Sequence, residues 1–312
     1  MKKLFISLLA VAALASCAKE DIIVADPGEL IGFNSFVENS TRATDPSYGA
    51  ADNAQKLTAF NVWGTVAADA SSTPVAIFAN DTVSGTVGTN STWTCTTKTQ
   101  YWLNGALYNF AALANAGTVT LGADLLPASV EFTSNGSTDL IYAKSATYTG
   151  KPAGQNQKVA FNFEHLLSKV YIQVTNNSVA ATDYSFLVKN IKINAPKTAG
   201  KYYIQTVGEN AAKTWTATNG DYTFANIAVA GGAAGAECAA EQLLIPGAAT
   251  ITFDVDILVG GKTMSTANYS YTTTLAAANA YSFNIKVSVG DTIQFTVEKQ
   301  PTWTENDPVD IN

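Results

Sequence analysis

The chain has 312 residues, enough for two ordinary domains, and 47% of them are hydrophobic, so it can form substantial cores. Only 14% of the residues are charged, the net charge is −7, and no basic cluster could neutralise a row of phosphates. The composition therefore predicts a folded protein and excludes nucleic acid as an expected partner.

The N-terminus has the pattern of an export signal. Two lysines precede the apolar run 4–14, which is too short to span a bilayer. The tetrapeptide Leu14-Ala15-Ser16-Cys17 then matches the lipobox of bacterial lipoproteins, and the charged residues 19–21 resemble a short signal for export to the cell surface. We predict that residues 1–16 are a lipoprotein signal peptide and that Cys17 is lipidated. Acyl chains hold a protein on a membrane because each buried methylene contributes about 0.8 kcal/mol.

A strand-like run follows, with Ile31, Phe33 and Val37 among its apolar residues. A polar connector leads from this run to Arg42 and Ala43. Arg42 is the only arginine of the chain, so an Arg-specific protease could cut at the Arg42–Ala43 bond alone, in a run of small polar residues typical of exposed, cleavable segments. We predict that residues 17–42 form a lipid-anchored propeptide with a removable first strand. The alternative is that a single arginine happens to fall here.

From residue 57 onward the chain is a succession of short β-type runs separated by Gly, Asn, Ser, Thr and Pro, and no stretch sustains a helical period. This pattern predicts an all-β protein, with an N-terminal sandwich at 43–157 and a C-terminal sandwich at 158–312. The connector 147–158 is the expected boundary. Alternation over 159–174 indicates two strands, or one kinked strand, leading into the second domain. Gly260-Gly261 predicts a tight hairpin turn.

The end of the chain contains a second alternating run, with Ile293, Phe295 and Val297 on one face. It repeats the Ile-x-Phe pattern of Ile31 and Phe33, so one groove could accept either run. Residues 291–304 are therefore a candidate donor-strand segment. The alternative is that this run is the last strand of its own sandwich.

Catalytic chemistry has little support. His165 is the only histidine and lies in an apolar strand run, which predicts a packed structural residue, and strand geometry places Ser168 on the opposite face. Asp254 and Asp256 share one strand face, for which a solvated face is the ordinary explanation. We predict no catalytic residues, no metal site and no cofactor.

Cysteine and tryptophan positions also favour packing. Cys95 and Cys238 are far apart and lack metal-ligand spacing. An exported location permits a disulfide between them, but their separation favours two independent small buried residues. The five tryptophans could line a glycan platform, but core packing is the expected role of each: Trp63, Trp93, Trp102, Trp215 and Trp303.

Several sequence features together resemble the fimbrillin family of Bacteroidota, over essentially the whole chain. Besides the lipobox and the strand ending in Thr-Arg-Ala, they are Phe-x-His-Leu-Leu-Ser-Lys-Val at 163–170, Leu-Ile-Pro-Gly at 244–247 and Tyr-Ser-Phe-Asn-Ile-Lys-Val at 281–287. The resemblance implies two tandem transthyretin-like (Greek-key) β-sandwich domains and a subunit of a type V pilus. In that family an Arg-specific surface protease removes the lipidated segment with the first strand, and a donor strand from a neighbour fills the gap.

The expected protein is thus a pilin without enzymatic activity that supports adhesion. Its expected partners are copies of itself or related pilus subunits, an Arg-specific surface protease and, through the lipid of the precursor, the outer membrane. The expected location is the outer membrane for the precursor and then the extracellular fimbrium. One alternative is a surface-anchored lipoprotein that serves as a pilus tip or anchor subunit, or as a glycan- or protein-binding adhesin. A secreted hydrolase would need a cluster of acids or a His-centred triad that the sequence lacks.

Overall fold

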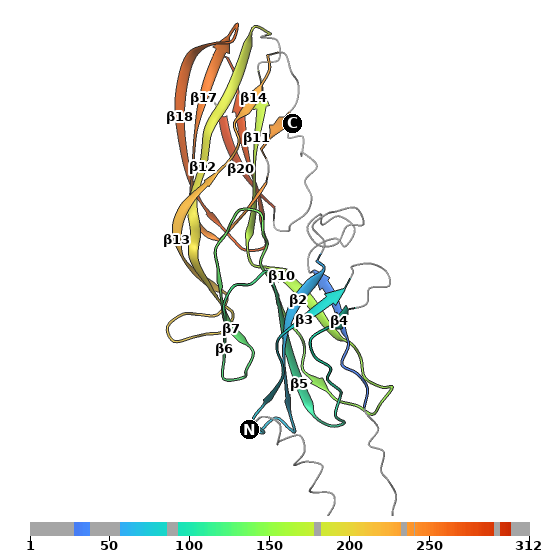
Figure 1. The fold of residues 1–312 in the computed structure, drawn as a ribbon. Coiled ribbons are helices and arrows are strands. Elements are labelled where there is room, and N and C mark those ends of the chain that lie inside the picture. The colour runs from blue at the N-terminus through green and yellow to red at the C-terminus, as the bar shows by residue number, and fades with distance from the viewer. Residues whose placement is uncertain are drawn as a thin grey trace, which may run out of the picture.

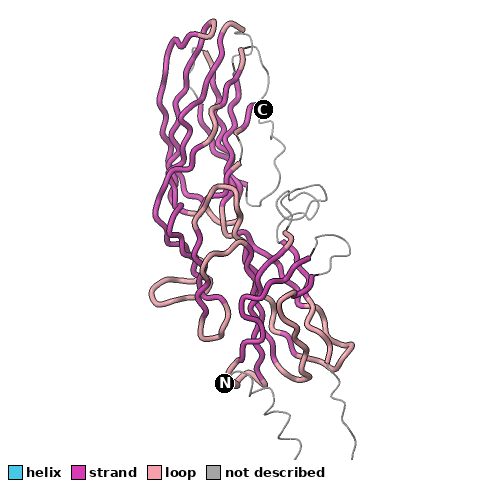
Figure 2. The backbone as a smooth tube through the Cα atoms, in the orientation of Figure 1, coloured by secondary structure: helices cyan, strands magenta, loops and turns pink. Residues whose placement is uncertain are grey.

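The computed structural model describes residues 28–37, 57–85, 93–177, 182–231, 236–239, 241–289 and 294–300. All regular secondary structure within these ranges is β-strand, which confirms the all-β prediction (Figures 1 and 2). In this described part of the chain no helix is long and apolar enough to cross a membrane. The transthyretin-like Greek-key topology of each domain stays a prediction.

The first sheet closes on itself, because β2 pairs with β3 on one side and with β5 on the other. Its strand order is β2-β3-β4-β1-β10-β8-β5-β9, and we call it the N-terminal barrel. Its strands are β1 (Phe33–Val37), β2 (Ala59–Ala67), β3 (Val75–Gly85), β4 (Trp93–Cys95), β5 (Leu107–Ala114), β8 (Ile141–Lys144), β9 (Tyr148–Thr149) and β10 (Val159–His165).

Side-chain alternation directs aromatic residues into this barrel. Along β10 the side chains alternate strictly between buried and exposed positions, with Phe161 and Phe163 fully inside. Gly64 on β2 lies under the rings of Phe78 and Phe110, where a Cβ atom would come within 2.6 Å of the Phe110 ring. The absence of a side chain at Gly64 therefore lets two large rings fill the core.

Strands mainly from the second half of the chain, with two short strands from residues 119–132, form two facing sheets, which we call the C-terminal sandwich. The smaller sheet has the order β15-β11-β19-β20 with β16 beside β11, and the larger has the order β18-β17-β12-β7-β6 with β13 and β14 beside β12. The strands are β6 (Val119–Leu121), β7 (Pro127–Phe132), β11 (Ser168–Asn176), β12 (Tyr184–Tyr203), β13 (Thr214–Thr223), β14 (Ile227–Val229), β15 (Ala236–Cys238), β16 (Gln242–Leu244), β17 (Gly247–Val259), β18 (Lys262–Leu275), β19 (Ala280–Val287) and β20 (Gln294–Gln300).

The sandwich core lies between these sheets and contains apolar residues from β11 and β19 on one side and from β12 and β17 on the other. The predicted hairpin at Gly260-Gly261 is confirmed, since it joins β17 to β18 with φ values of 58° and 76°. Positive φ at both central residues matches the right-handed twist of the flanking strands, and glycine adopts it without steric cost.

The two halves are joined by a third core made of residues from both. Trp63 and Leu113 of the barrel pack in one cluster with Val130 of β7, and Tyr202 of β12 belongs to the same cluster. Segment 159–174 forms two strands rather than a kinked one: β10 completes the barrel and β11 enters the sandwich. The change of sheet thus occurs at the buried pair Leu166-Leu167, later than the connector 147–158, and whether the predicted limits 43–157 and 158–312 describe independently folding units stays a prediction.

Candidate subunit-assembly site

Strand β1 is part of the barrel wall, where it lies between β4 and β10. It runs parallel to β10 over five residue pairs, from Phe33 opposite Val159 to Val37 opposite Phe163. On its other side it makes one antiparallel pair, Phe33 with Trp93 of β4. Because β4 pairs onward with β3, β1 is the link that joins β4 to β10. Without β1 the ring of strands would be open at this position.

Phe33 is the first residue of β1, and its side chain has no solvent exposure. Its ring is stacked on Phe161 at 6.0 Å between centroids, and it meets Phe60, Phe78 and Phe110 edge-on at 5.6–6.5 Å. Offset-stacked and edge-to-face contacts of this kind add to the energy of apolar burial. The predicted removable strand therefore supplies the centre of the aromatic core.

The residues before β1 are held by backbone bonds on both sides. Ile31 is buried and its amide donates to the Gln100 carbonyl at 2.9 Å, while the Gly32 carbonyl accepts from the Val159 amide at 2.8 Å. The Glu29 carbonyl accepts from the Trp102 amide at 2.9 Å. Ile31 and Phe33 thus enter the barrel core together, as their alternation predicts.

The Glu29 carboxylate binds the 154–156 loop, a contact that the sequence analysis missed. It accepts hydrogen bonds from the side-chain and backbone nitrogens of Asn156 and from the Gly154 amide, at 3.0–3.1 Å. These bonds lower the pKa of Glu29, and the bond from the Asn156 side chain has the largest effect. Because the partners are 125 and 127 residues away along the chain, no local sequence signal could have revealed them.

The candidate donor run lies at an edge. β20 pairs antiparallel with β19 over seven residue pairs, from Ala280 opposite Gln300 to Lys286 opposite Gln294, and it ends the smaller sheet of the sandwich. Phe295 and Val297 belong to this strand, whereas Ile293 lies outside the described residues. In the isolated chain β20 therefore adopts the alternative arrangement, that of a last strand in its own sandwich, and its role as a donor stays a prediction.

The other predicted maturation residues, Cys17, Arg42 and Ala43, also lie outside the described part of the chain. Their roles in lipidation and cleavage stay predictions. All of β1 precedes Arg42 in the sequence, so cleavage there would separate this strand from every other strand of the barrel.

His165 is packed, as predicted. It ends β10, is 3% exposed, and its Nδ1 atom lies 2.5 Å from Oδ2 of the equally buried Asp139. The Ser168 hydroxyl donates to the Ala276 carbonyl at 2.8 Å. His165 and Asp139 thus form a buried pair near the junction between barrel and sandwich. Asp139 was not singled out from the sequence, since its distance from His165 along the chain is 26 residues.

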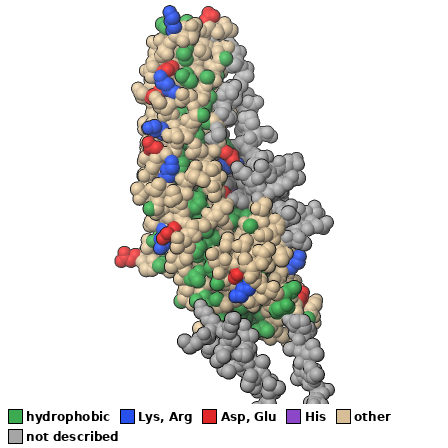
Figure 3. All heavy atoms as spheres, in the orientation of Figure 1, with side chains coloured by type: hydrophobic (Ala, Val, Ile, Leu, Met, Phe, Trp, Pro, Cys, Tyr) green, Lys and Arg blue, Asp and Glu red, His purple; other side chains and the backbone are tan. Residues whose placement is uncertain are grey.

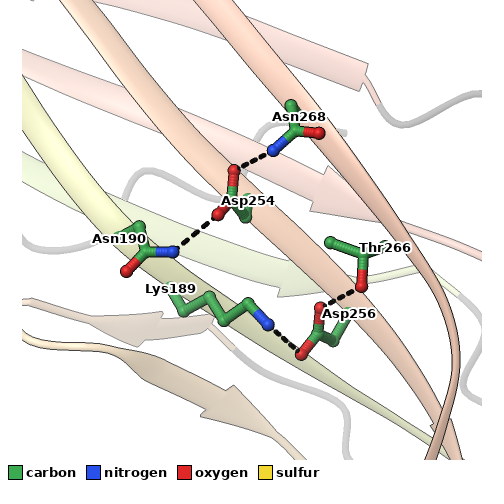
Figure 4. Close-up of polar contacts among 6 residues, drawn as sticks. All are labelled: Lys189, Asn190, Asp254, Asp256, Thr266 and Asn268. Atoms are coloured by element: carbon green, nitrogen blue, oxygen red, sulfur yellow. Dashed lines mark hydrogen bonds and ion pairs between the residues drawn. The ribbon is translucent and has the colours of Figure 1, made fainter.

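The expectation of a solvated face at Asp254 and Asp256 is wrong for Asp256, whose exposure is only 3% (Figure 4). Lys189 Nζ lies 2.5 Å from its Oδ2, and the Thr266 hydroxyl donates to its Oδ1 at 2.7 Å. The hydrogen bond from Lys189 lowers the pKa of Asp256 most, and the bond from Thr266 contributes to the same shift. Strands β12 and β18 on either side of β17 therefore cover a carboxylate that was expected to face water.

Asp254 is held by the same two neighbouring strands. It accepts from the Asn190 side chain at 2.6 Å and from the Asn268 side chain (Figure 4). The two aspartates thus form a polar ladder that ties three strands together, with neutral amides on one carboxylate and a lysine on the other. This arrangement is structural, because each carboxylate oxygen already accepts a bond from the protein.

The four tryptophans in the described part of the chain are packed, as predicted. Trp63, Trp93 and Trp102 are buried. Trp215 packs against the third core, which joins barrel and sandwich, and its indole nitrogen donates to the Leu166 carbonyl at 3.1 Å. Cys95 is half-buried and makes no disulfide. Among the described residues no group of three or more His, Cys, Asp or Glu side chains could hold a metal ion. Trp303 and the side chain of Cys238 lie outside the described part.

Comparison with known proteins places this architecture among solved folds. A fimbrial protein from Bacteroides vulgatus superposes with a TM-score of 0.58 at 15% identity, covering 89% of this chain and 100% of that one. Proteins assigned to cell adhesion from Bacteroides ovatus and Bacteroides uniformis give TM-scores of 0.53 and 0.50 at 17% and 18% identity, covering 89% and 88% of this chain and 99% and 98% of theirs. At these identities the likeness shows a shared fold.

No curated protein matches the sequence. The family model described as "Fimbrillin-like", however, matches residues 41–301, well over half of the chain. This match begins beside Arg42 and spans both the barrel and the sandwich. The chain therefore belongs to the fimbrillin-like family.

Proposed function

We propose that this protein is a structural subunit of a type V cell-surface pilus, without enzymatic activity. In this proposal it is exported as an outer-membrane lipoprotein through Cys17, cleaved after Arg42 and polymerised by donor-strand exchange. Family membership supports the pilus role. The observation that carries the assembly step is that β1, which lies wholly before Arg42, supplies the buried centre of the barrel.

Removal of β1 would leave a defined gap. Backbone groups of β10 would lose their partners, and the pockets of Ile31 and Phe33 would be open. Exposing two large apolar pockets costs on the order of 3–6 kcal/mol, at about 1.5–3 kcal/mol for each buried side chain. That is a large fraction of the roughly 5–15 kcal/mol by which a domain is stable. A cleaved subunit would therefore be driven to accept a strand along the open edge, by main-chain pairing and by alternate side chains entering the pockets.

The run at 291–304 has the side chains for this gap. Ile293 and Phe295 repeat the spacing of Ile31 and Phe33, and in this register Phe295 enters the aromatic pocket and Val297 follows it. The donor would then run parallel to β10, as β1 does. An edge position favours the exchange, because among the described strands β20 pairs with β19 alone. A neighbouring subunit would complete each barrel in turn.

The experiment is replacement of Arg42 by Ala and, separately, by Lys. Arg42→Ala should leave export and lipidation intact, because those signals end by about residue 21, yet abolish filaments on the cell surface. Arg42→Lys is the matched control for charge, and a protease that requires Arg should fail on it too. N-terminal sequencing of sheared filaments from the wild type should begin at Ala43.

An anchored tip, anchor or adhesin role gives a different outcome. In that case the protein would remain in the membrane fraction as acylated Cys17, with residues 17–42 still attached. Filaments that still contain the Arg42→Ala subunit would contradict the cleavage step. A product without acyl groups on Cys17 would contradict the lipoprotein step separately.

A further inference from the structure

An exposed apolar patch lies at the end of the barrel where β1 enters. Leu30 and Tyr101 form an isolated antiparallel bridge, and the flanking hydrogen bonds, from Ile31 to Gln100 and from Trp102 to Glu29, make it a non-hydrogen-bonded pair whose side chains are close neighbours. Ile31 and Trp102 point into the core, so Leu30, Tyr101 and Leu103 point outward. Their exposed fractions are 56%, 41% and 58%.

Hydrophobic side chains also gather at the barrel end of the face shown in Figure 3. Val75, 61% exposed, lies at the same end, because it pairs with Val66, which pairs with Tyr108. Isolated exposed apolar residues need no explanation, whereas a group of them at one pole indicates a contact surface.

Basic residues frame this patch. The described segments around it are 28–32, 97–105 and 150–158, and within them Lys98, Lys151 and Lys158 are exposed. The one carboxylate of these segments, that of Glu29, is bound by Asn156 and Gly154. Two further carboxylates lie next to them and are also held by the protein: Asp81 accepts from the Thr97 hydroxyl, and Asp69, on the hairpin that leads to Val75, accepts from Ser71 and Ser72. An apolar centre with lysines at its rim fits the boundary between acyl chains and anionic headgroups, where lysine stems lie along apolar surface and the ammonium groups reach the phosphates.

In the proposed lipoprotein, the chain itself would hold this pole near the membrane. Eleven residue steps separate Cys17 from Gly28, a reach of about 40 Å at most when fully extended. Leu30 belongs to the propeptide, so cleavage after Arg42 would remove the lipid and part of the patch together. A contact surface complete only in the precursor suits the membrane-bound stage, whereas an interface between mature subunits would retain all its residues.

We propose that the patch of Leu30, Tyr101 and Leu103, with its rim of lysines, rests on the anionic lipid surface in the lipidated precursor. The inference depends on lipidation of Cys17, which is part of the proposed function. The contact adds a second membrane signal to the acyl chains and orients the subunit with its barrel end toward the bilayer. Cleavage then removes the acyl chains together with Leu30, and leaves the patch incomplete.

The test uses the full lipidated precursor with Arg42→Ala, reconstituted in vesicles of phosphatidylethanolamine and phosphatidylglycerol. A photo-crosslinking amino acid replaces Leu103 or, as the matched control, Met264, which is 67% exposed and follows the β17–β18 hairpin at the opposite end of the molecule (Figure 1). Mass spectrometry should find phospholipid adducts at position 103 and none at position 264. Reversal of Lys98 and Lys151 to Glu should reduce the adduct at position 103 by about tenfold or more, and Lys262→Glu should leave it unchanged.

Each other outcome overturns the proposal. Adducts of position 103 with a second copy or another protein would identify a protein interface. Equal lipid adducts at positions 103 and 264 would show unoriented contact, and absence of lipid adducts from acylated protein would show that the pole stands away from the bilayer. Absence of acyl groups on Cys17, seen in the same mass spectra, would instead show that the proposed lipoprotein step fails and the inference with it.

Discussion

The barrel and the sandwich are built from different parts of the chain, and this decides how each would respond to proteolysis. The barrel has an aromatic core whose central residue, Phe33, comes from before Arg42. The sandwich has a core in which aliphatic residues outnumber aromatic ones. All of its strands follow Arg42, including β12 with 20 residues. Cleavage would thus remove an inner strand from the barrel and no strand from the sandwich.

The two strands that would be exchanged in the proposed assembly, β1 and β20, also differ in their position within their sheets. β1 lies between two strands of a closed ring, whereas β20 lies at the end of an open sheet. An inner strand leaves a two-sided gap that favours refilling, while an edge strand can depart with the loss of one set of backbone bonds. Under the proposed assembly, this difference in position would let the barrel accept a strand and the sandwich donate one.

The largest expected effect follows from removing the donor. Truncation after Gly290 should abolish polymerisation and leave a folded, exported, Arg42-cleaved monomer, because β19 stays paired with β11 over eight residue pairs. Truncation after Glu305 is the control, since it keeps 291–304 and should assemble normally. Pulldown and electron microscopy of surface fractions measure the outcome. A misfolded and degraded product would show instead that β20 is indispensable to its own domain.

The next effect concerns the barrel core. In the uncut Arg42→Ala precursor, Phe33→Ala should lower the free energy of unfolding by about 3–5 kcal/mol, because it empties a pocket lined by four phenylalanine rings. Leu30→Ala at an exposed neighbouring position should change it by about 0.5 kcal/mol or less. Urea denaturation measures both. A loss below about 1 kcal/mol for Phe33→Ala would mean that β1 is not integral to the barrel.

The smallest effect lies in the sandwich and depends on pH. The pKa of Asp256 is lowered by the bond from Lys189, so the ionised carboxylate stabilises the folded state above its ordinary pKa of about 4. This contribution disappears as the pH falls through the lowered, folded-state pKa. Wild-type protein should therefore lose more stability below pH 4 than Asp256→Asn, by about 1 kcal/mol or less.

Thermal unfolding at several pH values measures this difference. The matched control compares the single variant Lys189→Met with the double variant Lys189→Met and Asp256→Asn. Without the lysine, the pH-dependent difference in stability between the two proteins should be smaller. An equal difference with and without Lys189 would assign the pKa shift of Asp256 to Thr266 rather than to the lysine.

Local patterns predicted much of the architecture. The period-two alternation of β10 matches its buried and exposed positions, and Gly260-Gly261 marked a hairpin that the structure confirms. Both signals are local: alternation places successive side chains on opposite faces, and two adjacent residues with positive φ turn the chain. The burial of Phe33 also follows from the alternation of its strand.

The sequence by itself determined the all-β class, the family, the single arginine and the apolar run before it. Only the tertiary structure decided that β10 completes the barrel, that β2 and β5 close it, that Asp139 meets His165 and that Lys189 and Thr266 cover Asp256. These features depend on which strands become neighbours, and in what register, between segments tens of residues apart. Side-chain alternation has the same period whichever neighbour a strand has, so strand order and register follow from the packing of the whole core.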